Sequence, residues 1–211
     1  MIAAVVPAAG RSLRMGRPKL TLDVDGEPLI ARVVESLLGG GVECVVVVAP
    51  PRAAPGAVAL INAAGRAGAE VVILDAATVD MRATFERGLS RLESMPGGPP
   101  NTVFLCPGDL ADLTAEVVAS LVARVRETPE RIVVAMHQGR RGHPAALPWS
   151  VASAVRDLPP DQGVNALITR REAEVEGVEA DAGVLQDLDT PEDYERLRDR
   201  RGRRESSARA E

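Results

Sequence analysis

Aromatic side chains are scarce in this sequence: they make up only 2% of its 211 residues. Aliphatic residues and alanine must therefore fill the core, and the hydrophobic fraction of 45% is typical of a globular protein. Binding of single-stranded nucleic acid relies on stacking aromatic rings, which are too few here. The net charge of −5, from 25 basic and 30 acidic residues, provides no general basic field either. We therefore expect no nucleic-acid partner.

Cysteine is also scarce. Cys44 and Cys106 are too few for a disulfide framework, and because both lie in strand-like runs we expect buried thiols in a reducing cytoplasm. The sequence has no CxxC or HExxH spacing, which argues against a zinc site. The first ten residues lack the basic leader and long apolar run of a signal peptide, and no later run is long enough to span a bilayer. These absences predict a cytoplasmic protein with no membrane partner.

What the sequence does contain is an alternation of apolar runs with helical segments. The runs that read as strands cover residues 2–6, 42–49, 70–74, 101–109 and 131–137, and the segments that read as helices cover residues 28–41, 58–69, 81–93 and 114–127. The strands are apolar throughout, which is typical of a parallel sheet with helices on both faces. The alternation predicts a doubly wound, mostly parallel α/β fold in a single domain.

The alternation of strands and helices becomes less regular after residue 138. We expect a loop, short helices around 150–157 and 162–170, a strand pair near 173–186 and a last helix from Pro191. The end of the chain is polar and charged and has no apolar period. The prediction is therefore a domain over residues 1–198 and a disordered charged tail over residues 199–211.

The segment PAAGRSLRMGRPK, residues 7–19, directly follows the first strand. In open α/β sheets, ligands bind beyond the carboxyl ends of the strands. Gly10 and Gly16 allow the backbone to approach a ligand, while Arg14 and Lys19 add positive charge suited to phosphate oxygens. The glycine spacing fits neither a Walker A loop nor a Rossmann fingerprint. The segment is thus predicted to be a phosphate site of another kind.

The pattern Gly10-x-Ser12-x-Arg14-Met15-Gly16-x-Pro18-Lys19 resembles the signature of the MobA-like nucleotidyltransferases, which have a Rossmann-like fold of the glycosyltransferase-A type. Within that group the chain most resembles molybdenum-cofactor cytidylyltransferases, which move CMP from CTP onto molybdopterin. Ala8-Ala9-Gly10 looks like the cytidylyl type, because the guanylyl type usually has a second glycine in place of Ala9. The resemblance implies nucleotide binding by residues of this loop, namely Ala8, Ala9, Gly10, Ser12, Arg14, Gly16 and Lys19.

Two acidic residues are candidates for a metal site. Asp109 closes the run NTVFLCPGD, where the family has its metal-binding aspartate, although the proline that usually follows is absent. The stretch from Asp187 to Asp193 resembles the family's DIDTPED motif, and alternation on a strand would put Asp187 and Asp189 on one face. The resemblance implies that Asp109 and Asp189 hold Mg²⁺, an ion that prefers oxygen ligands and substrate phosphates. Arg14, Lys19 and Asp109 are then the expected catalytic residues.

Acceptor residues are suggested by two further motifs. The stretch from Arg140 to Pro144 resembles the family's GxRGHP, and residues 160–167 resemble GDxGAR, with Asn165 in place of the arginine. Arg141, His143 and Asn165 are therefore expected to contact the acceptor. The family's GMSxS motif has a counterpart only in DMRAT, residues 80–84, whose bulk and charge differ.

The sequence thus predicts an Mg²⁺-dependent cytidylyltransferase that acts on molybdopterin. One alternative is a nucleotidyltransferase with another nucleotide donor or a sugar-phosphate-type acceptor. The other is a non-catalytic accessory protein that delivers molybdenum cofactor to a molybdoenzyme partner.

Overall fold

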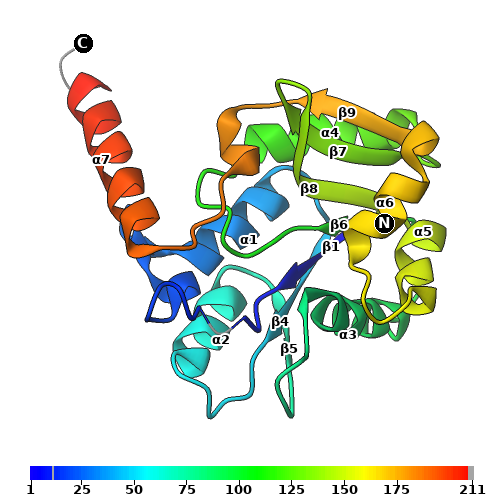
Figure 1. Cartoon of the computed structure of the whole chain (residues 1–211), viewed down its shortest axis with the longest axis horizontal. Helices are drawn as coiled ribbons and strands as arrows, with labels where there is room; N and C mark the ends of the chain where they lie inside the picture. Colours follow the sequence, from blue (N-terminus) through cyan, green and yellow to red (C-terminus); the bar gives the residue numbers. More distant parts are fainter. Residues whose placement is uncertain (11, 209–211) are drawn as a thin grey trace.

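The computed structural model describes residues 1–10 and 12–208. Its centre is a seven-stranded sheet (Figure 1). In spatial order the strands are β5 (Glu70–Ile73), β4 (Cys44–Ala49), β1 (Ile2–Pro7), β6 (Thr102–Leu105), β8 (Arg140–Pro148), β7 (Ile132–His137) and β9 (Val175–Glu179). Every neighbouring pair is parallel except those that involve β8, which runs antiparallel to both β6 and β7. The predicted mostly parallel α/β sheet is confirmed.

Helices cover both faces of this sheet, and β1 shows why its sequence is apolar throughout. Ile2, Ala4 and Val6 pack into one core cluster, whereas Ala3 and Val5 pack into the other. The first cluster is closed by α1 (Leu29–Gly39), α2 (Ala57–Arg66) and α4 (Ala115–Glu127). The second is closed by α3 (Met81–Glu93), α5 (Trp149–Ser153) and α6 (Val164–Arg170). A central strand buried on both faces has no position for a polar side chain.

Two of the expected helices begin at capping residues. Asp80 precedes α3, and its Oδ1 accepts a hydrogen bond from the Ala83 N–H at 2.7 Å. Thr114 precedes α4, and its Oγ1 accepts from the Val117 N–H at 3.4 Å. Both caps satisfy a donor that the first turn of the helix leaves free, and so fix where the helix starts.

The structure corrects the expectations for the region after residue 138. The expected loop is followed at once by β8, a strand whose second half, Ala145–Pro148, is buried between β6 and β7. The expected strand pair near 173–186 is wrong, because only β9 forms there and Ala182–Leu185 is a 3-10 helix. Residues 187–189 are loop rather than strand. Two short strands, β2 (Asp23–Val24) and β3 (Glu27–Pro28), form a hairpin that the sequence did not indicate.

The last helix, α7 (Pro191–Ala208), extends beyond the body of the molecule (Figure 1). It includes residues 199–208, which the sequence predicted to belong to a disordered tail, and residues 209–211 of that tail lie outside the described residues. Arg201 ties the helix to the body through ion pairs with Asp25, in the turn between β2 and β3, and with Asp112 at 3.1 Å. Across the described residues, no helix is both long and apolar enough to cross a membrane.

Candidate active site

The sheet has a topological switch point between β1 and β6. From β1 the chain first builds β4 and β5 on one side and then returns to place β6 on the other side of β1. Ligands of open α/β sheets bind at the carboxyl ends of the strands at such a point. The loop from Ala8 to Lys19 leaves β1 there, and the segment from Cys106 to Asp109 leaves β6 there. The fold therefore brings the glycine-rich loop and the first predicted metal ligand to one crevice.

Lys19 lies between the two predicted metal carboxylates. Its Nζ is 2.5 Å from Asp109 Oδ2 and 2.8 Å from Asp189 Oδ1. Arg14 completes the cluster, with a guanidinium nitrogen 2.8 Å from Asp189 Oδ2. A backbone hydrogen bond holds Asp189 next to Asp109, since the Leu188 N–H donates to the Asp109 carbonyl at 3.1 Å. Residues about 90 and 170 positions apart in the chain thus form one charged cluster, which we call the Lys19 cluster (Arg14, Lys19, Asp109 and Asp189).

The electrostatics of the cluster follow from its acidic surroundings. Burial alone would lower the pKa of Lys19, but the carboxylates of Asp109 and Asp189 outweigh burial and raise it. Partial desolvation and the charges of the same two carboxylates raise the pKa of Asp187 to about 6. Like charges disfavour a further ionised carboxylate, whereas an opposite charge stabilises the ammonium ion. The site therefore concentrates negative charge that one lysine and one arginine only partly balance.

The donor set suits a hard divalent cation. Asp109 Oδ1 is buried and has no hydrogen-bond partner among the described residues. Asp189 supplies a second carboxylate, and Asp187 lies close enough for its pKa to respond to both. No group of three or more His, Cys, Asp or Glu side chains in the described part of the chain could hold a metal by itself. That composition fits Mg²⁺, which is commonly bound by one or two carboxylates together with substrate phosphates.

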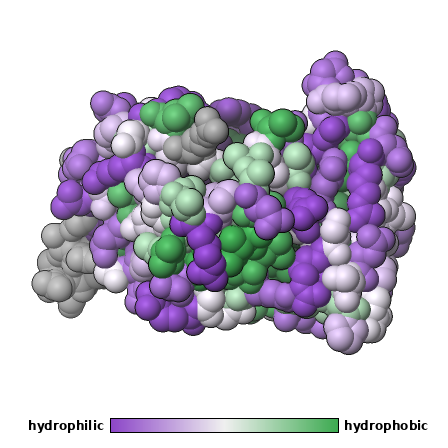
Figure 2. Space-filling view, turned by 90° about the horizontal axis from the view of Figure 1, so that it is seen from below, coloured by the Kyte–Doolittle hydropathy of each residue, from purple (hydrophilic) through white to green (hydrophobic). Residues whose placement is uncertain are grey.

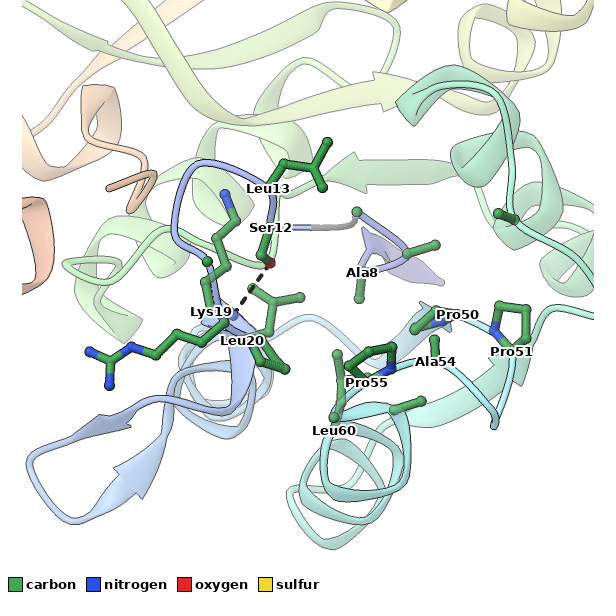
Figure 3. Close-up of a pocket in the computed structure, with 18 residues that line it drawn as sticks. Ala8, Ser12, Leu13, Lys19, Leu20, Pro50, Pro51, Ala54, Pro55 and Leu60 are labelled. Atoms are coloured by element: carbon green, nitrogen blue, oxygen red, sulfur yellow. Dashed lines mark hydrogen bonds between the residues drawn. The ribbon is translucent and has the colours of Figure 1, made fainter. Parts of the chain in front are cut away.

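A cavity of about 560 Å³ opens beside the first loop. One wall comes from the loop itself, with Ser12, Leu13, Lys19 and Leu20, and the Lys19 N–H donates to Ser12 Oγ at 3.3 Å (Figure 3). The facing wall is apolar and comes from the segment between β4 and α2 and from α2 itself (Figure 3). Its labelled members are Pro50, Pro51, Ala54, Pro55 and Leu60. On the side of the molecule where α2 lies, a hydrophobic area is surrounded by a mostly hydrophilic surface (Figure 2).

Two glycines of the loop have different roles. Gly16 has a φ of +69°, a conformation that favours glycine, and its N–H closes a turn on the Ser12 carbonyl at 3.1 Å. Gly10 needs no special conformation, and among the described residues beyond its chain neighbours a Cβ added there would meet no atom within 4 Å. Free space above the Gly10 backbone is what a ligand needs to reach its N–H group.

A second cavity, of about 450 Å³, lies on the β6 side of the same loop and reaches Asp109 and the start of α3. Five of the predicted nucleotide-binding residues line both cavities: Ala8, Ala9, Gly10, Ser12 and Lys19. Gly16 lines only the first. The Arg14 side chain is 72% exposed and contacts the site through Asp189.

The three predicted acceptor residues share a third cavity, of about 410 Å³, which Arg141, His143 and Asn165 line together. Arg141 is paired with Glu172 at 2.7 Å. His143 precedes Ala145, which pairs with Leu105 at the end of β6, so the histidine lies next to the segment that leads to Asp109. Desolvation lowers the pKa of His143, although the Asp109 charge and a hydrogen bond with the Leu105 backbone oppose this shift. Its Nδ1 has no partner among the described residues.

Comparison with known proteins identifies the family. The model of the MobA-like NTP transferase domain matches residues 4–175. The chain belongs to this family. A comparison with curated proteins gave no significant match.

Solved structures resemble the transferase over nearly its whole length. A nucleotidyl transferase from Methanothermobacter is 26% identical, with a TM-score of 0.73 and coverage of 95% of this chain and 97% of the other. A manganese complex of Rv0371c from Mycobacterium tuberculosis is 23% identical, with a TM-score of 0.69 and coverage of 93% and 97%. A CMP:2-keto-3-deoxy-manno-octonic acid synthetase in complex with CTP is 16% identical, with a TM-score of 0.71 and coverage of 97% and 98%. The last two show the shared fold. With the family match, these findings confirm that the chain is a nucleotidyltransferase.

Some residues of the transferase site were not indicated by its sequence. The proline-rich wall between β4 and α2 carries no reactive side chain, so only its position reveals it. Arg17 lines the first cavity, and its guanidinium lies 5.1 Å from the centre of the Tyr194 ring on α7. This cation–π contact links the loop after β1 to the last helix.

Proposed function

We propose that this MobA-like transferase moves CMP from CTP to a phosphorylated acceptor, molybdopterin, in an Mg²⁺-dependent reaction that releases pyrophosphate. One observation carries the proposal. Lys19 joins Asp109 and Asp189 at the switch point of the sheet, directly beside two cavities lined by the glycine-rich loop. A cation, two carboxylates and a glycine-rich loop are parts on which phosphoryl-group transfer commonly relies.

Each group of the Lys19 cluster has a role in this proposal. Asp109 and Asp189 would hold Mg²⁺, which when bound neutralises charge on the nucleotide phosphates. Lys19 and Arg14 then bind phosphate oxygens and stabilise the charge that develops on the leaving pyrophosphate. An acceptor phosphate is already anionic when it attacks the α-phosphorus, so the proposed reaction needs no general base. Catalysis rests on positioning and electrostatics.

Two of the structural relatives support a divalent metal and a CTP donor. The Rv0371c structure is a complex with manganese, and the synthetase structure is a complex with CTP. Ala9, in the place where guanylyl-transferring relatives usually have glycine, supports CTP over GTP. The free thiols of Cys44 and Cys106 support a reducing compartment, the cytoplasm, as the place of the reaction.

The acceptor is proposed to bind in the third cavity. Arg141, His143 and Asn165 share its wall, and His143 lies beside the segment that leads to Asp109. Arginine suits an acceptor phosphate, whereas a neutral histidine and an amide suit the polar edge of a heterocycle. Asn165 provides no charge at the position where the GDxGAR motif has an arginine.

The first experiment is calorimetric titration of CTP, GTP, ATP and UTP in the presence of Mg²⁺. We expect binding that favours CTP, requires Mg²⁺ and is lost in Asp109→Asn. The matched control is Asp199→Asn, which removes the same charge from an exposed position on α7. Preference for another nucleotide would refute the cytidylyl assignment. Unchanged Mg²⁺-dependent binding by Asp109→Asn would refute the metal assignment.

Turnover then tests the acceptor. We expect pyrophosphate release from CTP only when molybdopterin is added. Release with a sugar phosphate but not with molybdopterin would show that the acceptor assignment is wrong. It would leave the assignment as a nucleotidyltransferase unchanged. Nucleotide binding without turnover on either acceptor would favour an accessory protein that delivers cofactor to a molybdoenzyme.

A further inference from the structure

Arg82 connects the donor side of the site with the acceptor side. It lies in the first turn of α3, immediately after Asp80 and Met81, which line the 450 Å³ cavity that also contains Lys19 and Asp109. This is the stretch in which DMRAT stands in place of the serine-rich GMSxS motif. The arginine is therefore a property of this chain rather than of the motif that it resembles.

The guanidinium of Arg82 is enclosed by main-chain oxygens of a distant loop. One nitrogen, Nη1, donates to the carbonyls of Leu158, Pro159 and Gln162, at 2.9, 2.8 and 3.2 Å. Because this nitrogen carries two hydrogens, at least one of them is shared between two carbonyls. The side chain is only 16% exposed, and its Nε is 3.3 Å from Glu86 Oε1. Three carbonyl oxygens around one nitrogen, with a carboxylate beside Nε, thus hold this cation in place.

The loop that encloses the Arg82 guanidinium leads directly to the 410 Å³ cavity, where the acceptor is proposed to bind. The Gln162 N–H donates to the Pro159 carbonyl at 3.0 Å, so the three carbonyls meet around one turn. Gly163 follows as the residue before α6, and the first turn of α6 carries Asn165, which lines the 410 Å³ cavity. A change in the position of this turn therefore moves Asn165.

We propose that Arg82 is a positioning residue that fixes α6, and with it the acceptor cavity, to the donor side of the site. The acceptor role of that cavity rests on the proposed function, whereas the mechanical link rests on the contacts of Arg82. Thr84, two residues after Arg82, lines the 450 Å³ cavity, and its Oγ1 is 2.6 Å from Thr78 Oγ1. The start of α3, which lines that cavity, and the turn before α6 are therefore held together through Arg82.

The link is tested first without any ligand. Hydrogen exchange of the backbone amides of residues 163–170 is measured by mass spectrometry in the full chain, in Arg82→Gln and in Arg87→Gln, a control at an exposed position on the same helix. We expect exchange of this segment to be about tenfold faster in Arg82→Gln and unchanged in Arg87→Gln. Equal exchange in all three proteins would overturn the proposal.

The second test separates positioning from general stability. With CTP and molybdopterin as substrates, Arg82→Gln should raise KM for molybdopterin about tenfold while KM for CTP changes less than about twofold. Arg82→Lys should recover part of the loss, because an ammonium group can donate to the same carbonyls but has no second nitrogen beside Glu86. A fall in kcat with both KM values unchanged would indicate a merely structural role and refute the proposal.

The two tests also distinguish the proposal from the function on which it rests. If wild-type protein does not turn over molybdopterin, the proposed acceptor is wrong, and the exchange experiment still decides the role of Arg82. If Arg82→Gln does not fold, Arg82→Lys takes its place in both experiments, with intermediate exchange and an intermediate KM expected. Wild-type values for Arg82→Lys in both would then count against the link.

Discussion

Replacement of Lys19 by methionine is the most informative single change. Methionine keeps an unbranched side chain of similar length but removes the cation between Asp109 and Asp189. The side chains of Lys19 and Asp109 are each 15% exposed, and that of Asp189 is 28% exposed. Removing one partner of a fully buried ion pair costs about 3–5 kcal/mol, whereas exposed pairs contribute about 0–1 kcal/mol. Because these groups are partly exposed and Arg14 still contacts Asp189, we expect a loss of about 2 kcal/mol.

The assay is thermal unfolding in buffer with a chelator. For a chain of this size, about 2 kcal/mol corresponds to a fall in Tm of roughly 4–8 °C. Millimolar Mg²⁺ should then raise the Tm of Lys19→Met more than that of the wild type, because the two carboxylates no longer have the ammonium ion between them and bind a divalent cation more tightly. Turnover should fall about 10²-fold or more, because the variant lacks the positive group that is proposed to bind the phosphates.

The control is Arg66→Met, which removes one positive charge from an exposed position on α2. It should change the free energy of unfolding by less than about 0.5 kcal/mol and show no Mg²⁺ effect beyond that of the wild type. The reasoning is refuted if Lys19→Met behaves like Arg66→Met in both measurements. It is also refuted if the variant loses stability but Mg²⁺ does not restore any of it.

Three further predictions concern Gly10, His143 and Arg201. Gly10→Ala should keep the free energy of unfolding within about 0.5 kcal/mol of wild type, because the new Cβ meets no atom of the described residues beyond its chain neighbours. The same change should weaken CTP binding in calorimetry, and unchanged affinity would contradict a close approach of the ligand to the backbone. His143 has a pKa lowered by desolvation, so the folded protein binds fewer protons than the unfolded chain and loses stability as the pH falls below about 6.5. The free energy of urea unfolding, measured between pH 7.5 and 5, should fall less steeply with pH in His143→Gln than in a His137→Gln control. Parallel curves for the two variants would contradict this role of His143. Arg201→Gln removes the ion pairs with the β2–β3 turn and with Asp112, and a Tm lowered by about 2–4 °C is expected in calorimetry; an unaltered Tm would show that these pairs do not anchor α7.

Much of the fold could be predicted because its signals are local. The helix expected over residues 81–93 has those bounds in the structure, since its apolar spacing and its cap are both encoded within a few residues. The strand β8 was missed because its first half, with Gly142, His143 and Pro144, is polar and irregular. The place of β8 between β6 and β7 depends on which strands it pairs with, and no local sequence pattern indicates these partners. Antiparallel insertion into a parallel sheet is a property of the whole topology.

The candidate site, like the fold, could be predicted only where its signals are local. Lys19, Asp109 and Asp189 could be predicted as a set because each lies in a motif, and the structure places them in contact; their roles stay predictions until the variants are measured. The strand geometry used to place Asp189 was wrong, and the residue reaches the site through a loop that binds the Asp109 backbone. The contacts of Arg82 could not be predicted, because a change of residue type does not reveal which distant carbonyls will face it.

The position of Lys19 has a practical consequence for chemical work on this protein. It is the only lysine in the sequence, since arginine supplies the other 24 of the 25 basic residues. Lysine-directed reagents, whether acylating labels, cross-linkers or immobilisation resins, therefore have one side chain to modify, and that side chain lies between two carboxylates. Attachment through lysine thus acts on the charged cluster itself. Labelling at Lys19, measured separately from labelling at the N-terminal amine, therefore reports whether a ligand or metal has changed the surroundings of this side chain.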